Sequence, residues 1–357
     1  MNSELRILAI NVGSTSTKIT CFKGTQPMVT ESITYSSDEL SQYRSLEDQL
    51  PRREADVFAF LDNHAVNVDD IDIIISRGGL GKPGAAGAYE INTTMCEDLL
   101  TGKYGRHPSA LGPAIAMRIG EKHNRPAIVI DPPSTDEFHE LARISGLPDI
   151  ERKSAFHALN QKAAARRAAA QLGKAYEAVN LVVAHLGGGI TIGAHKNGAV
   201  IDCTHGLGEG PFTPERCGSL PTLDLVKLSY SGEYSRDELE KKLVGRGGLF
   251  AYLDTSDAKK VQDMIKTGNT RAELIFKAMA YQVAKDIGAM YAVLKGNVQG
   301  IVLTGGLAQS ELLTQWIEDW VGSIAPVFIY PGEDEMLAMA EGADRVLRKD
   351  EQVKKYE

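Results

Sequence analysis

The sequence predicts a duplicated α/β fold, in which two similar domains each contain a β-sheet covered by helices. Two distant stretches share one pattern: an apolar strand ends in a polar residue, an apolar residue and a glycine-led turn, and a second strand follows. Asn11, Val12 and Gly13 of the first stretch correspond to His185, Leu186 and Gly187 of the second. The length of 357 residues also fits two domains of ordinary size.

The first half is predicted to begin with three strands and then to alternate helices with strands. Gly24 and Pro27 mark turns between the opening strands, because glycine and proline favour turn conformations. Apolar side chains recur at helical spacing after Pro51, which indicates a helix near 53–64. In chain order, we expect strands at 5–11, 17–22 and 28–34, that helix, a buried strand at 71–75, a helix from about Pro108 and a strand at 127–130.

The second half repeats this order with more helices. Its opening strands are expected at 181–185, 190–194 and 199–202, and an alanine-rich helix at 157–172 connects the halves. Further on, we expect helices over most of 223–229, 236–244 and 271–294, a strand at 301–303, a helix at 308–323, a strand at 327–329 and a helix at 335–348. The repeated order supports duplication.

Composition narrows the class of protein. A formal charge of −8 argues against a protein that mainly binds nucleic acid, because such proteins normally carry a basic patch. Cys21, Cys96, Cys203 and Cys217 are widely spaced, which favours free thiols in a reducing compartment. No signal segment opens the chain, and no apolar run approaches the roughly 18 residues of a membrane span. We therefore expect a soluble, cytoplasmic protein.

Several familiar motifs fail on closer reading. The stretch 79–84 matches GxGxxG after a strand, but no helix start follows it, as a dinucleotide site requires. No GxxxxGK[ST] is present, and Arg143 stands where HExxH needs its second histidine. Cys203, His205 and Cys217 lack a common zinc spacing, so core and turn positions are the better interpretation.

The turn between Asn11 and Lys18 is the strongest candidate for ligand binding. Such a turn directs backbone N–H groups toward one point, beside hydroxyl groups and a cation, and so suits phosphate oxygens. A plain hairpin turn with surface threonines is the alternative. Similar turns at 185–189 and 304–306 favour the phosphate interpretation. A helix starting just after Gly306 would add the positive end of its dipole.

Two arginines and several acids are further candidates. Arg77 ends a buried strand, so it needs either a structural ion pair or an anionic ligand. Arg216 lies in a loop stiffened by two prolines, which suits contact with developing charge, although a solvated loop arginine is the alternative. Asp131 precedes two prolines, which predicts an extended residue that either holds Mg²⁺ or forms an Asx turn. Glu333, Asp334 and Glu335 precede the last helix, where they complement its dipole or coordinate a metal ion.

Six motifs in this order resemble the acetate kinase family, and specifically its butyrate kinase branch. They are NVGSTSTK at 11–18, SRGGL at 76–80, FHALN at 156–160, HLGGG at 185–189, PERCG at 214–218 and TGG at 304–306. The resemblance covers nearly the whole chain, although acetate kinases are longer and have HLGNG in place of HLGGG. It implies an α/β fold of duplicated ribonuclease H-like (actin-like ATPase) domains with a cleft between them. Residues 1–154 with 331–357 would form the acyl side, and 155–330 the nucleotide side.

The resemblance also implies roles for individual residues. Catalytic roles would fall to Arg77, Asp131, His157 and Arg216. Phosphate and nucleotide contacts would come from Asn11, Ser14, Lys18, His185, Gly187, Gly188, Gly189, Thr304, Gly305 and Gly306, with Asp257 a weaker candidate on the adenosine side. Leu80 and Phe156 would join Arg77 at the acyl substrate, and Glu335, Asp131 and Asn11 would bind Mg²⁺, with Glu333 and Asp334 competing for the place of Glu335. His107 lies about one position from a histidine of the family, so no role is transferred to it.

The implied reaction is reversible, direct in-line transfer of a phosphoryl group from ATP to a short-chain fatty acid, giving ADP and an acyl phosphate. Butyrate is the first choice of acid, and branched acids and propionate also fit. A sugar kinase with Asp131 as general base, or a nucleotide-dependent interaction switch of the actin or chaperone type, are the alternatives. The expected partners are a small carboxylate and a nucleotide, without nucleic acid or membrane, in a homodimer or higher homo-oligomer.

Overall fold

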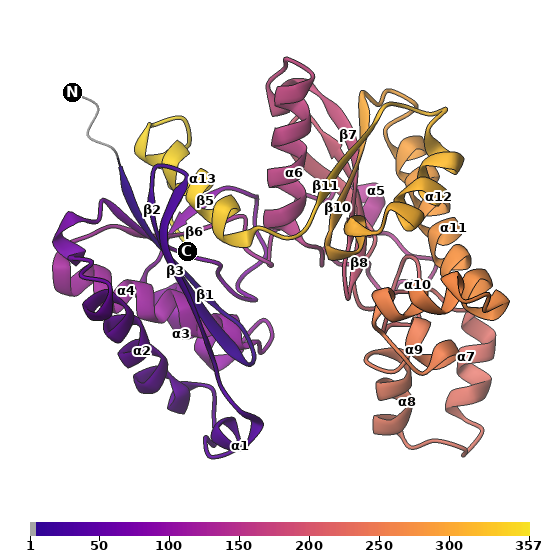
Figure 1. Ribbon diagram of the computed structural model, residues 1–357, viewed down its shortest axis with the longest axis horizontal. Helices are drawn as coiled ribbons and strands as arrows, with labels where there is room; N and C mark the ends of the chain where they lie inside the picture. The colour runs from indigo at the N-terminus through magenta and orange to yellow at the C-terminus, as the bar shows by residue number, and fades with distance from the viewer. Residues whose placement is uncertain (1–4) are drawn as a thin grey trace. The chain divides into compact units, whose positions relative to one another are not determined.

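The computed structural model describes residues 5–357. The chain divides into two compact units: unit 1 is Met1–Thr135 with Asp334–Glu357, and unit 2 is Asp136–Glu333. Unit 1 is therefore built from two separate stretches of the chain. The last helix, yellow in Figure 1, accordingly lies among the indigo and violet elements of the N-terminal stretch.

Unit 1 contains a six-stranded sheet in the order β3-β2-β1-β4-β6-β5. Its strands are β1 Arg6–Val12, β2 Ser16–Lys23, β3 Gln26–Thr34, β4 Ile73–Ser76, β5 Ala88–Glu90 and β6 Ala127–Ile130. The first three strands pair antiparallel, whereas β4 pairs parallel with β1 and β6 pairs parallel with β4. The short β5 closes the edge in the antiparallel direction.

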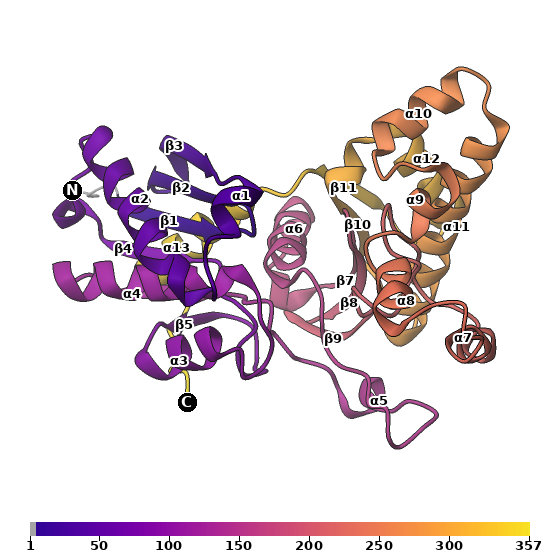
Figure 2. The same ribbon diagram turned by 90° about the horizontal axis from the view of Figure 1, so that it is seen from below.

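Helices cover both faces of this sheet. They are α1 Ser37–Leu40, α2 Leu50–Asn63, α3 Thr93–Thr101, α4 Leu111–His123 and α13 Glu335–Leu347, with 3-10 turns at Glu47–Gln49, Val68–Asp70 and Pro108–Ala110. Alternate residues of β1, among them Leu8 and Ile10, pack into one core with α2, α3 and α4. Helix α13 contacts β1, β4 and β6 from the opposite face (Figures 1 and 2).

Unit 2 contains a five-stranded sheet in the order β11-β10-β7-β8-β9. Its strands are β7 Asn180–Leu186, β8 Ile190–Lys196, β9 Ala199–Cys203, β10 Gly300–Gly305 and β11 Val327–Pro331. Again the first three strands pair antiparallel, and β10 and β11 extend the sheet in parallel from β7. The order β8-β7-β10-β11 therefore repeats β2-β1-β4-β6, and the glycine turns after β1 and β7 occupy equivalent places.

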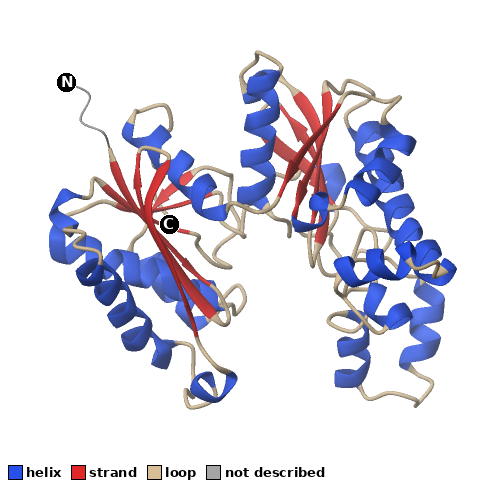
Figure 3. Ribbon diagram, in the orientation of Figure 1, coloured by secondary structure: helices blue, strands red, loops and turns tan. Residues whose placement is uncertain are grey.

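The helices of unit 2 are unevenly divided between the faces of its sheet. They are α5 Glu140–Arg143, α6 Ala158–Gln171, α7 Thr222–Ser229, α8 Arg236–Leu243, α9 Gly248–Leu253, α10 Ala258–Lys266, α11 Thr270–Val293 and α12 Glu311–Val321, with 3-10 turns at Tyr176–Ala178 and Gly306–Gln309. The alanine-rich face of α6 packs on Leu181 and Val183, whereas α11 and α12 pack on Val182 and Ala184. Figure 3 shows the helices on either side of each group of strands.

Two local expectations from the sequence are wrong. A 3-10 turn follows Gly305, and α12 begins only at Glu311 because the Ser310 hydroxyl accepts from Leu313 N at 3.2 Å as a helix cap. No helix dipole therefore starts just after Gly306. Asp131 has φ 40° rather than an extended backbone. Within residues 5–357, none of the helices combines the length and apolarity required to cross a bilayer.

Candidate active site

The turn after β1 presents its polar side chains from a regular hairpin. Asn11 lies directly opposite Lys18 in the register of β1 and β2, so both side chains are on one face of the pair. Gly13 N donates to Ser16 O at 2.8 Å and closes the turn, and Ser14 and Lys18 are exposed. The expected phosphate-binding groups of this turn are therefore available to a ligand.

A buried arginine stabilises the same turn by binding its backbone carbonyl oxygens. Arg53 on α2 is 1% exposed, and its guanidinium donates to the carbonyl oxygens of Gly13, Ser14 and Ser16 at 3.0–3.1 Å. It also stacks over the Tyr35 ring at 4.5 Å. Burial lowers the pKa of Arg53. The sequence analysis missed this residue, although it lies four positions before Val57 on the apolar face of the expected helix.

Three residues expected at the site meet in unit 1. Glu335 Oε2 accepts from Asn11 Nδ2 at 2.7 Å, and Glu335 Oε1 pairs with Arg77 Nε at 3.1 Å. The side chains of Arg77 and Glu335 are 27% and 21% exposed, so the pair is accessible from solvent. Arg77 thus has the ion-pair partner that its position requires, and it also remains open to a ligand.

The three consecutive acids before α13 make three different contacts. Glu333, the last residue of unit 2, pairs with His185 Nε2 at 3.1 Å. Asp334 caps α13 by accepting from Leu337 N at 3.0 Å. Among these described contacts, only Glu335 reaches Asn11 and Arg77.

His107 is a second residue that the sequence analysis did not assign to the site. Its half-buried ring is close enough to Arg77 and Glu335 to feel their charges, and its Nδ1 accepts from Ser109 N at 3.2 Å. Burial lowers the pKa of His107, and the nearby Arg77 cation lowers it further against the opposing effect of Glu335. A neutral imidazole therefore stands beside the arginine and can donate from Nε2.

Asp131 is enclosed within unit 1. It is 1% exposed, and its Oδ1 accepts from Gly87 N at 2.8 Å while its own N–H donates to Gly87 O at 3.1 Å. These two bonds tie the end of β6 to the segment before β5. Asp131 therefore orders the backbone of unit 1, and in this conformation one oxygen is already committed.

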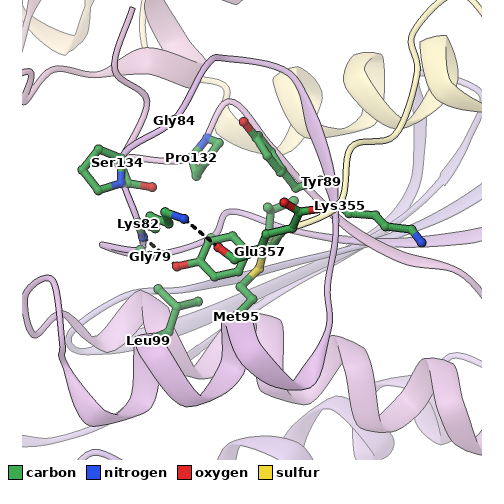
Figure 4. A pocket seen from close by; sticks show the side chains of 15 residues that line it. Gly79, Lys82, Gly84, Tyr89, Met95, Leu99, Pro132, Ser134, Lys355 and Glu357 are labelled. Carbon is green, nitrogen blue, oxygen red and sulfur yellow. Dashed lines mark hydrogen bonds between the residues drawn. The ribbon is translucent and has the colours of Figure 1, made fainter.

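A cavity of about 190 Å³ opens beside the two glycines that follow Arg77. Figure 4 shows Met95, Leu99 and Pro132 pointing toward it, with Lys82 bonded to the backbone of Glu357. Gly78, Gly79, Gly81, Val129 and Tyr356 are also among its lining residues. Of the two other residues expected at the substrate, Leu80 packs beside Gly105, and Phe156 belongs to a hydrophobic cluster in unit 2.

In unit 2, the turn after β7 is packed closely against catalytic candidates. An added Cβ on Gly187 would lie 2.8 Å from Glu333 Oε1 and 2.9 Å from His185 Nε2. An added Cβ on Gly189 would collide with the Arg216 guanidinium and lie 3.3 Å from His157 Cε1. Glycine is needed here because the neighbours leave no room for a side chain.

Two histidines stack face to face beside this turn. The His157 and His185 rings are 3.7 Å apart at 11°. His185 Nδ1 bonds to Asn160 Oδ1 at 2.7 Å, and His157 Nδ1 bonds to Thr191 Oγ1 at 2.9 Å. Both expected histidines are therefore fixed by specific partners.

Arg216 is held rigidly but keeps unused donor capacity. Its Nη1 donates to Gly206 O at 2.6 Å, and its buried Nε has no partner within the described part of the chain. The Thr213 hydroxyl donates to Gly188 O at 2.7 Å, which ties the Arg216 loop to the glycine turn. Burial lowers the pKa of Arg216. A buried guanidinium N–H without a partner is costly and is well suited to an anionic ligand.

The third glycine turn also approaches this group. Gly305 has φ 91°, and an added Cβ there would collide with the backbone of Leu186. Thr304 is buried and bonds to Gly332 O at 3.4 Å. Asp257, the weaker candidate for the adenosine side, caps α10 by accepting from Lys259 N at 2.9 Å. The ends of β7 and β10 thus pack together, while Asp257 has a local structural contact.

The chain is similar to known proteins of one family. Residues 149–351 match the model of the acetokinase family. An acetate kinase from Porphyromonas gingivalis superposes with a TM-score of 0.77 at 18% identity, over 96% of this chain and 100% of that chain. A propionate kinase from Francisella tularensis gives 0.74 at 18%, over 95% and 98%, and an acetate kinase from Entamoeba histolytica gives 0.75 at 16%, over 95% and 99%. These structural matches confirm the predicted class of two actin-like α/β domains.

Proposed function

Because the chain belongs to the acetokinase family, we propose that it transfers the terminal phosphoryl group of ATP to the carboxylate of a short-chain fatty acid, reversibly and in line. The proposal rests on one arginine in each unit. Arg77 is accessible from solvent, and the buried Nε of Arg216 has no hydrogen-bond partner within the described part of the chain. Arg77 lies beside Asn11 and Glu335 in unit 1, and Arg216 lies beside the glycine turn in unit 2.

The acceptor needs charge compensation rather than deprotonation. The carboxyl group of a fatty acid has a pKa near that of glutamate, about 4.3, so it is ionised at neutral pH. Its approach to the triphosphate is opposed by the repulsion of two anions, which grows in a site that excludes water. Arginines fixed before the substrates arrive reduce this repulsion without reorganising.

In unit 1, Arg77 is suited to hold the acid. Glu335 engages its Nε, so the two Nη groups can donate in parallel to a carboxylate. Asn11, Ser14 and Lys18 would bind phosphate oxygens at the neighbouring turn.

In unit 2, the glycine turn and its neighbours are suited to the nucleotide. The backbone of residues 187–189 allows close approach of phosphates, and Thr304, Gly305 and Gly306 would extend this surface. Arg216 would donate to the transferring group from its fixed position, and His157 would donate a further hydrogen bond. Transfer requires the two units to bring these half-sites to one substrate pair.

The residues present fit a magnesium ion that enters with the nucleotide. Residues 5–357 contain no group of three His, Cys, Asp or Glu side chains that would hold a metal unaided. Mg²⁺, however, commonly takes one or two carboxylates and completes its shell with water and substrate phosphates. Glu335 and the Asn11 amide would supply the protein ligands, and Asp131 could act through water. When bound, the ion would neutralise phosphate charge.

We assign the acyl chain to the cavity beside Gly78 and Gly79. Its volume of about 190 Å³ exceeds that of several water molecules, each of which occupies roughly 30 Å³ in the liquid. Met95, Leu99 and Val129 give it apolar walls that suit a chain longer than acetate. Butyrate and branched acids of similar size are therefore the proposed substrates.

One assay series tests the proposal. Release of ADP should be measured with straight and branched acids from acetate to hexanoate, with a hexose, and without an acceptor. We expect the highest kcat/KM with a four- or five-carbon acid and little hydrolysis without acid. Phosphorylation of the hexose alone would favour the sugar kinase alternative, and hydrolysis that no acceptor stimulates would favour an interaction switch.

A further inference from the structure

A line of buried polar side chains crosses unit 2 and ends at His157. Tyr176 OH lies 2.7 Å from His195 Nδ1, and His195 Nε2 lies 3.0 Å from Gln161 Oε1. Gln161 Nε2 lies 3.0 Å from Thr191 O and 2.8 Å from Thr191 Oγ1, which in turn lies 2.9 Å from His157 Nδ1. His195, Gln161 and Thr191 are fully buried, and Tyr176 nearly so.

The strand β8 is shaped for this line. Thr191, Gly193 and His195 alternate along β8 and therefore share the face toward α6, which carries Gln161. An added Cβ on Gly193 would lie 2.6 Å from Gln161 Oε1. A glycine inside a buried strand weakens it, so a close contact of this kind is a reason for its presence.

The direction of the hydrogen bonds follows from one group that only accepts. The backbone carbonyl of Thr191 accepts from Gln161, so the nitrogen of the Gln161 amide faces Thr191. The amide oxygen of Gln161 must then accept from His195 Nε2–H. Burial lowers the pKa of His195 well below its ordinary value, so this ring is neutral and its Nδ1 accepts from the Tyr176 hydroxyl.

The hydrogen bonds of the Thr191 hydroxyl continue this order of donors and acceptors to His157. Its oxygen accepts from Gln161 Nε2, and the backbone N–H of His157 approaches it at 3.5 Å. Among the contacts of residues 5–357, the acceptor left for the Thr191 proton is His157 Nδ1. An imidazole that accepts at Nδ1 carries its proton on Nε2.

The charges around His157 favour its neutral form. His185, from β7, stacks on it at 3.7 Å and presents Nε2 to the Glu333 carboxylate, an arrangement that requires a proton on that nitrogen. Arg216, from the 210–218 loop, and His157 both lie against the Cα side of Gly189. A positive charge on His157 would therefore lie near the Arg216 cation, which opposes it.

We propose that Tyr176, His195, Gln161 and Thr191 are positioning residues that hold His157 as the neutral Nε2–H tautomer, a permanent hydrogen-bond donor to the phosphoryl group. The role toward phosphate rests on the proposed function, whereas the tautomer does not. His157 then neither removes nor supplies a proton during transfer, in keeping with an acceptor that is already ionised.

The protonation of the His157 ring can be measured directly. Long-range ¹H–¹⁵N spectra of histidine-labelled protein distinguish the tautomers, and a His157→Gln variant identifies the His157 signals. We expect a proton on Nε2 and none on Nδ1 between about pH 6 and pH 8. A proton on Nδ1, or a charged ring across this range, would overturn the proposal.

Matched variants test the line of side chains. Thr191→Val removes the hydroxyl with little change of shape, and Thr191→Ser keeps it. We expect Thr191→Val to populate both tautomers and to lower kcat about 10-fold with little change in KM, and Thr191→Ser to restore the wild-type spectrum. Tyr176→Phe, at the far end, provides a second variant if Thr191→Val fails to fold. An unchanged His157 spectrum in the folded variants contradicts the proposal.

The two proposals can fail separately. If His157 is the Nε2–H tautomer but the protein phosphorylates none of the acids, the role of the four positioning residues stands and the proposed function is wrong. If the protein phosphorylates a short-chain acid but His157 carries its proton on Nδ1, the proposed function stands and the role of the four positioning residues is wrong.

Discussion

The glycine turns after β1 and β7 occupy equivalent places in their sheets but are stabilised differently. In unit 1, the buried cation of Arg53 binds three carbonyl oxygens of the turn. Lys18 on β2 lies opposite Asn11 on β1. In unit 2, the neutral Thr191 lies opposite His185, and glycines allow side chains to pack directly on the turn. The first turn is thus held by a buried cation that binds its carbonyl oxygens, and the second by side chains, charged ones among them, that pack closely against its glycines.

One short segment serves both turns. Glu333 pairs with His185 in unit 2, and Glu335, two residues later, bonds to Asn11 in unit 1. The polar residue that ends the first strand of each sheet therefore has an acid partner from the segment that joins the units.

The largest effect should come from the arginines. Arg216→Ala should lower kcat about 1000-fold, because a fixed donor to the transferring group is lost. Arg77→Ala should act mainly on the acid and lower kcat/KM by a similar factor. Steady-state ADP release with circular dichroism as a check on folding provides the measurement.

Exposed arginines provide matched controls for these variants. Arg236→Ala in unit 2 and Arg118→Ala in unit 1 each remove a surface arginine paired with one glutamate, and both should leave turnover within about 2-fold. Near-normal rates in both Arg77→Ala and Arg216→Ala would remove these residues from the mechanism.

The outline of the fold could be predicted from the sequence because it depends on local patterns. The strands around Asn11 and His185 and the long helix near 271–294 follow from apolar periodicity and turn residues. The start of α12 could not be predicted, because Ser310 caps the helix and so begins it later than the apolar pattern suggests. At Asp131, the paired bonds with Gly87 override the preference of a residue before proline.

Some site residues could likewise be predicted from local sequence patterns, and others depend on contacts between distant segments. Arg77, Asn11 and Glu335 were predicted from strand ends and family motifs, and the structure brings them together. Arg53 and His107 were missed because their roles arise from segments distant in sequence. Whether a helix arginine faces solvent or a turn 40 residues away is decided by packing, which a periodic pattern does not specify.

The second-largest effect should be on unit 1 alone. Arg53→Met should lower the free energy of unfolding of that unit by about 3 kcal/mol, because three carbonyl oxygens of the turn and the buried Thr17 hydroxyl lose their donor. It should also raise the KM for ATP, since the turn loses its support. Urea unfolding and nucleotide titration of Arg53→Met and Arg53→Lys give the measurement. Unaltered affinity for nucleotide in a destabilised variant would restrict Arg53 to a structural role.

Replacing one glycine by alanine in each of the two turns should show whether activity depends on close packing against that turn. An added Cβ on Gly13 would lie 3.4 Å from Ser16 Oγ, an ordinary contact, whereas on Gly189 it would collide with Arg216. We therefore expect Gly13→Ala to change kcat less than about 3-fold and Gly189→Ala to lower it about 10- to 100-fold, through displacement of Arg216 and His157. Equal losses in the two variants would contradict the distinction between the turns.

The smallest effect concerns the pH dependence of stability, and it compares one histidine from each unit. Burial lowers the pKa of half-buried His107, and it lowers the pKa of fully buried His195 much further. Both rings are thus neutral in the folded protein at pH values where the unfolded chain begins to bind protons, near about 6.5. The free energy of unfolding should be steady with respect to these groups above about pH 6.5 and should fall below it.

This loss should reach at most about 1.4 kcal/mol per pH unit for each histidine. For His107 it should level off at a higher pH than for His195, because the folded pKa of His107 is less depressed. Urea titrations between about pH 5 and pH 7.5 can therefore compare His107→Gln with His195→Gln. The His195 variant should lose more of the slope, because its ring lies among neutral hydrogen-bond partners with no access to water. Equal losses of slope in the two variants would show that burial excludes the proton from His195 no more strongly than from His107.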